Sequence, residues 1–249
     1  MSRRILVTGG SRGIGAAISR AFAGLGDVVA VHCWSSREAA DAVVASLPGQ
    51  GHVVVQADLR DADAVRAMVD AAAAALGGID VLVNNAGVFF SHPIEEATYE
   101  EWQAAWADTL GVNLVGAANA TWCAVRHMLR DGSARIVNVG SRGAFRGEPD
   151  SPAYGASKAA IAAFGQSLAK SLGGSGIAVS TVAPGFVETE MAGEHLEGEL
   201  GDATRAQSPF NRVATPEEIA AAVVWLASPE AQWASGAILD LNGASYMRM

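Results

Sequence analysis

Short apolar segments alternate with longer stretches of helical periodicity along the whole chain. Most apolar segments are nearly continuous runs rich in Val and Ile, which is typical of strands covered on both faces. We expect strands at residues 4–7, 28–31, 52–56, 81–83, 136–139, 178–182 and 238–241. The longer stretches predict helices at residues 14–24, 37–46, 62–76, 99–129, 154–172 and 216–227.

This alternation indicates right-handed crossovers between parallel strands. We therefore predict an α/β protein with a Rossmann-type, doubly wound, seven-stranded parallel sheet and helices on both faces. Residues 185–215 interrupt the alternation, because their periodicity is weak and Gly, Glu, Thr and Pro are mixed. We interpret this stretch as a flexible segment and a candidate lid. No repeat or low-complexity linker divides the chain, so we expect one domain over residues 1–249.

The composition excludes several classes of protein. Half of the residues are hydrophobic and the formal net charge is −9, which favours a large core and disfavours nucleic-acid or membrane partners. No apolar run approaches the roughly 20 residues of a membrane helix, and the one after Arg3 and Arg4 is too short for a signal peptide. Cys33 and Cys123 have no metal-ligand spacing. We expect no metal site, reduced thiols and a cytoplasmic protein.

A glycine-rich segment, TGGSRGIG at residues 8–15, follows the first predicted strand. Between a strand and a helix, the backbone N–H groups of such a turn receive a pyrophosphate, and glycine lets the phosphate approach. The Gly-x3-Gly-x-Gly spacing differs from GxGxxG, and a tight connection without a ligand is the alternative. We predict cofactor contacts from Gly9, Ser11, Arg12, Gly13, Ile14 and Gly15.

The residues after the second predicted strand bear on which nicotinamide cofactor binds. Enzymes that prefer NAD usually place an acidic side chain there, but this chain has no carboxylate before Glu38. Arg12 and Arg37 offer guanidinium groups for a 2′-phosphate, and Ser35 or Ser36 adds a hydroxyl. We predict that NADP(H) is favoured over NAD(H). The alternative for Arg37 is a solvated residue in the first turn of a helix.

Two further segments belong to the predicted cofactor site. After the third strand come Asp58 and Leu59, where the carboxylate either accepts from the adenine amino group or caps a helix. After the fourth strand, Asn85, Ala86 and Gly87 either pack against the cofactor or form an ordinary turn.

Tyr154 and Lys158 are the candidate catalytic pair, because residues four apart share one helix face. A phenol has an ordinary pKa of about 10, and a neighbouring cation lowers that pKa towards the range useful for acid–base catalysis. Ser141, at the end of the strand over 136–139, is placed to donate to a substrate carbonyl oxygen. Tyr-x3-Lys alone is a weak motif. Its position at the carboxyl edge of the predicted sheet, where open parallel sheets bind ligands, supports a catalytic role.

In order and spacing, these motifs resemble the short-chain dehydrogenase/reductase family, in its single-domain branch. The resemblance runs from Arg4 to Tyr246 and is carried by TGGSRGIG, Asp58, NNAG at 84–87, Asn113, Ser141, YGASK at 154–158, and Pro184-Gly185 with Thr189. The sequence looks most like 3-oxoacyl-[acyl-carrier-protein] reductases, through APGFVETEM at 183–191 and the terminal LNGASYM.

The resemblance implies a role for each catalytic residue. Tyr154 would be the general acid/base, and Lys158 would lower its pKa and hold the nicotinamide ribose. Ser141 would polarise the carbonyl. Asn113 would keep a water that links Lys158 to solvent, or else be a helix-interior amide satisfied by backbone.

The resemblance also implies the nicotinamide pocket and the assembly. Thr189 and the Val187 backbone would hold the carboxamide, with a helix cap as the alternative for Thr189. Pro184 and Gly185 would shape the ring pocket. The substrate would be a small-molecule carbonyl or alcohol. The enzyme would assemble as a homodimer or homotetramer.

Several departures make an acyl-carrier substrate only one candidate. Residues 142–150 are charged where the active-site wall is expected, and residues 172–176 lack the basic groups that suit an acidic carrier. Phe89, Phe90, Phe145 and Met191 line an apolar pocket or are core or subunit-contact residues.

Three functions stay open at this point. The leading hypothesis is an NADPH-dependent carbonyl reductase, or an alcohol dehydrogenase in the reverse direction. A catalytically silent NADP(H)-binding sensor or scaffold is the alternative, although a sensor needs no tuned phenol. A dehydratase or epimerase is the third, because a fold does not fix a reaction.

Overall fold

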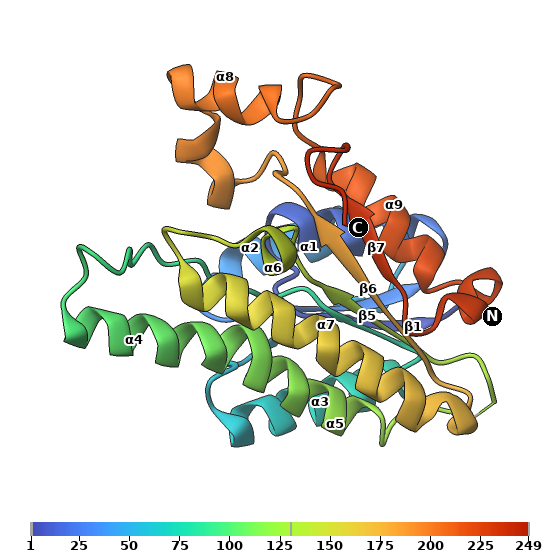
Figure 1. Cartoon of the computed structure of the whole chain (residues 1–249). Helices are drawn as coiled ribbons and strands as arrows, with labels where there is room; N and C mark the ends of the chain where they lie inside the picture. Colours follow the sequence, from blue (N-terminus) through green and yellow to red (C-terminus); the bar gives the residue numbers. More distant parts are fainter. Residues whose placement is uncertain (1, 130, 249) are drawn as a thin grey trace.

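The computed structural model describes residues 2–129 and 131–248, with the backbone alone at residues 194 and 195. Seven parallel strands form one sheet in the order β3-β2-β1-β4-β5-β6-β7 (Figure 1). The strands are β1 (Arg4–Val7), β2 (Val28–Cys33), β3 (Val53–Gln56), β4 (Val81–Asn84), β5 (Arg135–Val139), β6 (Ala178–Pro184) and β7 (Ile238–Leu241). The predicted doubly wound parallel sheet is confirmed.

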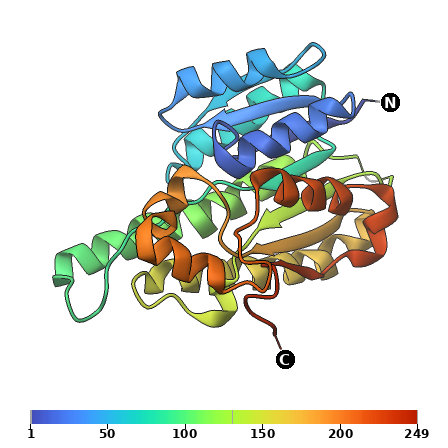
Figure 2. The ribbon, with the colours of Figure 1, turned by 90° about the horizontal axis from the view of Figure 1, so that it is seen from above.

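Helices cover both faces of this sheet, as the view from above shows (Figure 2). The α-helices are α1 (Gly13–Gly24), α2 (Arg37–Ser46), α3 (Ala62–Leu76), α4 (Tyr99–Leu110), α5 (Ala117–Ala124), α6 (Gly143–Arg146), α7 (Pro152–Leu172), α8 (Gly198–Ala206) and α9 (Pro216–Leu226). Shorter helical segments are η1 (Gly111–Gly116), η2 (Gly173–Ser175), η3 (Glu190–Leu196) and η4 (Pro229–Ala234). Within the described residues, no helix is both long and apolar enough to cross a membrane.

The core is divided between the two faces of the sheet. Because successive side chains of a strand point to opposite faces, Ile5 and Val7 pack with α1, α2 and α9, whereas Leu6 packs with α3, α5 and α7. Both clusters consist almost wholly of aliphatic residues. This division buries the five inner strands on both sides, as their continuous apolar sequences predict, whereas the edge strands β3 and β7 are only partly buried.

The helix predicted over residues 99–129 is present, but it ends at Ala124 and contains a π turn that the sequence did not predict. It consists of α4, the π-helical η1 and α5, which follow one another without a break. Glycine is required at position 116, because a Cβ there would lie 2.7 Å from both the Leu59 Cβ and the Leu59 carbonyl oxygen. The wide π turn between α4 and α5 contains Asn113, and such turns are frequent at functional sites.

The stretch over residues 185–215, expected to be a flexible segment, contains regular structure. It forms η3 and α8, which stand above the carboxyl edge of the sheet (Figure 1). A parallel bridge between Val187 and Ala214 closes its base, where Glu188 N–H donates to the Ala214 carbonyl over 2.9 Å. Both helical segments are short, so their periodicity is too weak to read from the sequence.

Candidate active site

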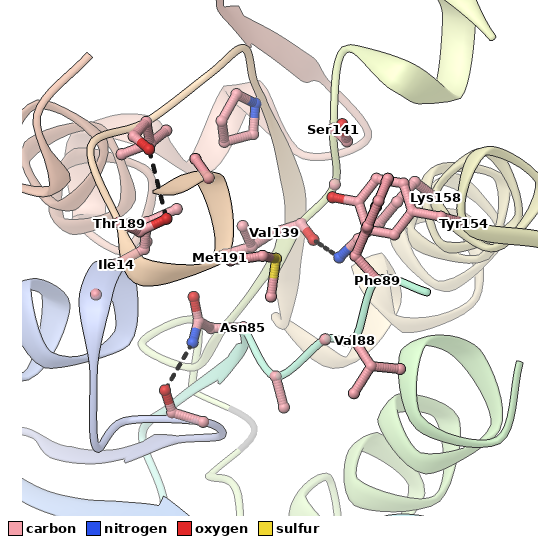
Figure 3. Close-up of a pocket in the computed structure, with 18 of the residues that line it drawn as sticks. Ile14, Asn85, Val88, Phe89, Val139, Ser141, Tyr154, Lys158, Thr189 and Met191 are labelled. Carbon is pink, nitrogen blue, oxygen red and sulfur yellow. Dashed lines mark hydrogen bonds between the residues drawn. The ribbon is translucent and has the colours of Figure 1, made fainter. Parts of the chain in front are cut away.

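A cleft of about 850 Å³ opens at the carboxyl ends of the strands. Gly9 follows β1, Asn85 follows β4, Ser141 follows β5 and Gly185 follows β6, and all four line the cleft. This is the edge at which open parallel sheets bind their ligands. Figure 3 shows Tyr154, Lys158 and Ser141 on one side of the cleft, and Ile14 and Thr189 across from them.

The glycine turn packs too closely to accept larger residues. A Cβ on Gly15 would lie 2.1 Å from the Gly9 carbonyl oxygen, and Gly9 itself has a φ of +63°. No side chain of the described residues caps the first turn of α1. Its N–H groups at Gly13, Ile14 and Gly15, which line the cleft, are therefore available to an anion.

His32 holds this turn in place, a role that the sequence did not reveal. The Gly9 N–H donates to the His32 Nδ1 over 3.0 Å, and Nε2 lies 3.1 Å from the Ala57 carbonyl. Burial lowers the pKa of His32, which favours the neutral ring that these two contacts require. No motif spacing reports such a contact, because it joins residues that are distant in the sequence.

Arg12 reaches from the glycine turn to the loop after β2. Its Nη2 donates to the Ser36 hydroxyl over 2.7 Å, and its Nη1 pairs with Glu190 of η3 over 3.1 Å. Arg37 instead pairs with Asp41 on α2, over 3.3 Å. Of the predicted cofactor residues after β2, neither Ser35 nor Arg37 lines the cleft, and Ser11 of the turn does not line it either.

Charged and aromatic side chains close the end of the cleft beyond β3. Asp58 pairs with Arg60 over 2.7 Å, and the hydrogen bond from Arg60 holds the pKa of the Asp58 carboxyl below its usual value. The Arg60 guanidinium stacks on the Trp34 ring at 5.2 Å. Asp61, rather than Asp58, caps α3. Leu59 lines the cleft as predicted, whereas Trp34 and Arg60 belong to no motif and were missed.

The segment after β4 connects the glycine turn with the candidate catalytic residues. The Asn85 side chain donates to the carbonyls of Thr8 and Gly9 over 2.9 and 3.0 Å. Ala86 and Gly87 also line the cleft. A Cβ on Gly87 would lie 3.3 Å from the Lys158 Nζ. This segment therefore fixes the turn and leaves room beside the lysine.

Tyr154 and Lys158 lie on the first turns of α7, which Pro152 begins. The Lys158 Nζ donates to the Val139 carbonyl over 2.9 Å and lies 5.6 Å from the centre of the Tyr154 ring. Phe89 packs edge-on against that ring at 5.1 Å. The phenol, the ammonium and Ser141 therefore meet at one wall of the cleft (Figure 3).

Burial dominates the acid–base properties of this pair. Burial raises the pKa of Tyr154 to about 12, although its hydrogen bond with Ser141 acts in the opposite direction. Burial also lowers the pKa of Lys158 to about 8. The expected lowering of the phenol's pKa by the lysine does not appear in the protein alone, because removal of both groups from water favours their neutral forms.

Asn113 lies behind the cleft wall and does not line it. Its Oδ1 accepts from the Val88 N–H over 2.8 Å, and its Nδ2 donates to the Val88 carbonyl and the Ser157 hydroxyl, each over 3.0 Å. These contacts fit the interpretation of a satisfied buried amide. They also hold the segment after β4 against α7.

The predicted nicotinamide residues after β6 meet at the cleft. Pro184, Gly185, Val187 and Thr189 all line it. Thr189 precedes η3 but its side chain does not cap that helix; its hydroxyl contacts the Val187 carbonyl at 3.4 Å.

Three of the four predicted apolar pocket residues, Phe89, Phe90 and Met191, line the cleft as well. Phe145 does not line it and instead lies 4.3 Å from the Arg248 guanidinium.

The chain is similar to known oxidoreductases over nearly its full length. A family model described as Enoyl-(Acyl carrier protein) reductase matches residues 9–243. The 3-oxoacyl-[acyl-carrier-protein] reductase FabG of Staphylococcus aureus strain Mu50 is 36% identical, with 99% of each chain covered. The cis-4-hydroxycyclohexanecarboxylate dehydrogenase of Sinomonas cyclohexanicum is 39% identical, with 97% of this chain and 95% of that protein covered.

The chain is also similar to a solved structure that contains a bound cofactor. The short-chain dehydrogenase of Burkholderia cenocepacia J2315 in complex with NADP superimposes with a TM-score of 0.89. It is 39% identical, and the match covers 98% of this chain and 97% of that one.

Proposed function

Because the chain belongs to the short-chain dehydrogenase/reductase family of oxidoreductases, we propose that it is an NADPH-dependent carbonyl reductase with Tyr154 as its general acid. The observation that carries this proposal is the meeting of Tyr154, Lys158 and Ser141 at one wall of a cleft whose other end is a glycine turn. In such a cleft, a phenol beside an ammonium and a hydroxyl can donate a proton and a hydrogen bond to a carbonyl oxygen.

The cleft fits a dinucleotide. The uncapped first turn of α1 and the close packing at Gly15 form a cradle for a pyrophosphate, which a side chain at position 15 would disrupt. Thr189 and the Val187 backbone would hold the nicotinamide carboxamide, and Lys158 would hold the adjoining ribose. When bound, NADPH supplies the hydride that reduces the carbonyl carbon.

The protein's own residues handle the proton. Ser141 donates a hydrogen bond to the carbonyl oxygen and orients it, and Tyr154 then gives its phenolic proton to the same oxygen, so that the product is an alcohol. The Lys158 ammonium stabilises the resulting tyrosinate by its charge. The Asn113 side chain keeps the segment after β4 in register with α7. As the family resemblance implies, we assign to Asn113 a water through which solvent replaces the proton that Lys158 passes on to the tyrosinate, so that the phenol is restored.

The preference for NADPH over NADH is supported by Arg12. Its guanidinium spans the gap between the glycine turn and Ser36, where a 2′-phosphate on the ribose would lie, and the loop after β2 brings no carboxylate to the cleft. The phosphate would take the place of Glu190 as the partner of Arg12.

Assembly and substrate range complete the proposal. We propose a homodimer or homotetramer, as expected from the family resemblance. The names of the relatives include an acyl-carrier thioester reductase and a hydroxycyclohexanecarboxylate dehydrogenase.

Two measurements on one preparation test this function. Energy transfer from tryptophan to nicotinamide, with Trp34 at the cleft as a donor, would follow titrations with NADPH and NADH. The loss of reduced nicotinamide would then be followed with a panel of ketones, quinones and 3-oxoacyl thioesters. We expect tighter binding of NADPH and turnover of at least one panel member. Binding without any turnover would favour the silent sensor, and no binding of either nucleotide would overturn the proposal.

A further inference from the structure

The arginines that line the cleft differ in how their charge is balanced. Arg12 pairs with Glu190, Arg60 pairs with Asp58, and Arg146 lies 3.7 Å from Glu148. Arg142 also lines the cleft, but it forms no ion pair with any residue that the structure describes. It directly follows Ser141, which we place at the substrate carbonyl.

Arg142 is also the most deeply buried of these arginines, with 3% of its surface exposed. Its Nη1 donates to the Ser245 hydroxyl over 2.6 Å, and its guanidinium lies 5.3 Å from the centre of the Phe186 ring. Nε and Nη2 donate to no atom of the described residues. Because Arg142 lines the cleft and a neighbouring cavity, these two donors are available to a ligand.

Arg135 shows how the chain balances a buried arginine that has a structural role. Only 1% of its surface is exposed and it too has no carboxylate partner among the described residues. However, its guanidinium donates to the carbonyls of Gly132, Ala134 and Ser228 over 2.7, 2.9 and 3.3 Å. Arg142 has one hydroxyl in place of these three carbonyls. A buried cation with so little compensation is costly unless a ligand supplies the counter-charge.

The surroundings of Arg142 indicate where that ligand lies. The residue lines both the cleft and a neighbouring cavity of about 280 Å³, whose polar groups include Ser208, Asn242 and Ser245. Arg212 in the same cavity is paired with Glu218 over 2.6 Å. Glu148 acts on Arg142 electrostatically without forming an ion pair with it, and Arg146 repels it. A guanidinium that forms no ion pair and keeps free N–H donors is suited to a carboxylate, which accepts parallel hydrogen bonds from an arginine.

We propose that Arg142 binds a carboxylate of the substrate, so that the enzyme reduces oxo acids or oxidises the corresponding hydroxy acids. The carboxylate would lie in the cavity behind Ser141, while the carbonyl lies in the cleft at Tyr154. This inference rests on the proposed reductase function and names the substrate class of the same site. Arg142 is then a specificity-determining residue that contacts the substrate.

Matched pairs of acid and ester test this assignment. The probes are 3-oxobutanoate, 4-oxopentanoate and 5-oxohexanoate, each compared with its ethyl ester in NADPH oxidation by the wild type. The series covers the spacing between the carbonyl and the carboxylate. We expect at least one acid to exceed its ester in kcat/KM by about tenfold or more, since a hydrogen bond to a charged group contributes that much.

The variant Arg142→Gln is expected to reduce this acid-to-ester ratio by about ten- to a hundredfold, mainly through KM for the acid. The matched control is Arg135→Gln, which removes a buried arginine remote from the cleft and should keep the wild-type ratio. Esters reduced as well as acids by the wild type, or an unchanged ratio in Arg142→Gln, would overturn the assignment. No reduction of any acid or ester would instead count against the reductase function.

A measurement on the wild type covers the case in which Arg142→Gln does not fold. With NADPH present, pentanoate should inhibit reduction of a neutral ketone competitively, and pentanamide of the same size should inhibit at least about tenfold more weakly. Equal inhibition by the acid and the amide would contradict a cationic anchor for the substrate.

Discussion

The two ends of the cleft differ in how the charges of their basic side chains are balanced. At the end beyond the glycine turn, Arg12 and Arg60 are already paired with carboxylates and largely in contact with water. At the end around α7, Lys158 and Arg142 are buried, and neither has a carboxylate partner among the described residues. At the glycine turn, the site therefore depends on backbone geometry and on surface ion pairs that a ligand can replace. Around α7, basic side chains without an ion pair are buried away from water.

This difference has a consequence for how each end responds to change. A paired surface cation loses little when its partner is exchanged for a phosphate. A buried cation gains strongly from an anionic or developing negative charge, because the surroundings screen it weakly. Substitutions at the glycine turn should therefore affect nucleotide affinity, and those around α7 should affect turnover or the affinity for substrate.

The largest expected effect is that of Tyr154→Phe. Removal of the phenolic hydroxyl should lower kcat by about 10³-fold, because the proton donor is lost, while NADPH binding stays within about twofold. The control is Tyr246→Phe, whose hydroxyl donates to the Phe145 carbonyl away from the cleft. Steady-state rates and NADPH titrations on both variants make the comparison. A Tyr154→Phe enzyme with near wild-type turnover would remove the phenol from the mechanism.

Gly15→Ala tests the nucleotide-binding end of the cleft. The new Cβ would lie 2.1 Å from the Gly9 carbonyl, so the turn must open. Overpacking of about 3 kcal/mol would weaken NADPH and NADH alike by about a hundredfold. Gly24→Ala in the same helix meets no atom within 4 Å and serves as the control. If Gly15→Ala binds both nucleotides as the wild type does, the cradle lies elsewhere.

Arg12→Ala refines the comparison within the nucleotide end. Loss of a charged hydrogen bond to the 2′-phosphate should weaken NADPH about tenfold more than NADH. Arg37→Ala should leave the ratio of the two dissociation constants unchanged, because Arg37 pairs with Asp41 outside the cleft. Equal losses for both nucleotides in Arg12→Ala would assign the arginine to the shared pyrophosphate.

The smallest expected effect concerns the pH dependence of stability. The pKa of Lys158 falls from 10.5 to about 8 on burial, so the unfolded chain binds more protons between these values. The free energy of unfolding should therefore rise by about 2 kcal/mol between pH 8 and pH 9.5 through this residue. The window ends before pH 10, above which the raised pKa of Tyr154 begins to lower stability.

Denaturant unfolding at several pH values checks this dependence. Lys158→Met should lose the rise, whereas Lys170→Met, an exposed residue of the same helix, should keep it. An identical pH profile in all three proteins would mean that burial does not lower the pKa of Lys158.

Local sequence was enough to predict the sheet and most of the site. Continuous apolar runs predicted all seven strands. The order of the motifs predicted that Gly9, Asn85, Ser141 and Gly185 lie at the carboxyl edge of the sheet. These features depend on strand burial and on chain connectivity, which sequence patterns report directly.

The remaining features depend on contacts between distant parts of the chain. The π turn at 111–116 follows from close packing of Gly116 on Leu59, and His32 serves the glycine turn from a neighbouring strand. The burial of Arg142 arises where the ends of β5 and β6 meet the C-terminal segment. The pairing of Arg37 with Asp41 is an exception, since its four-residue spacing on a helix is visible in the sequence.

The most direct test of the central claim follows the hydride itself. Wild-type enzyme would reduce a ketone or oxo acid with NADPH deuterated at both C4 positions, and mass spectrometry would weigh the product alcohol. The account predicts an alcohol one mass unit heavier than the unlabelled product, with the label on the former carbonyl carbon. Product without deuterium, or nucleotide binding that never yields an alcohol, would contradict it.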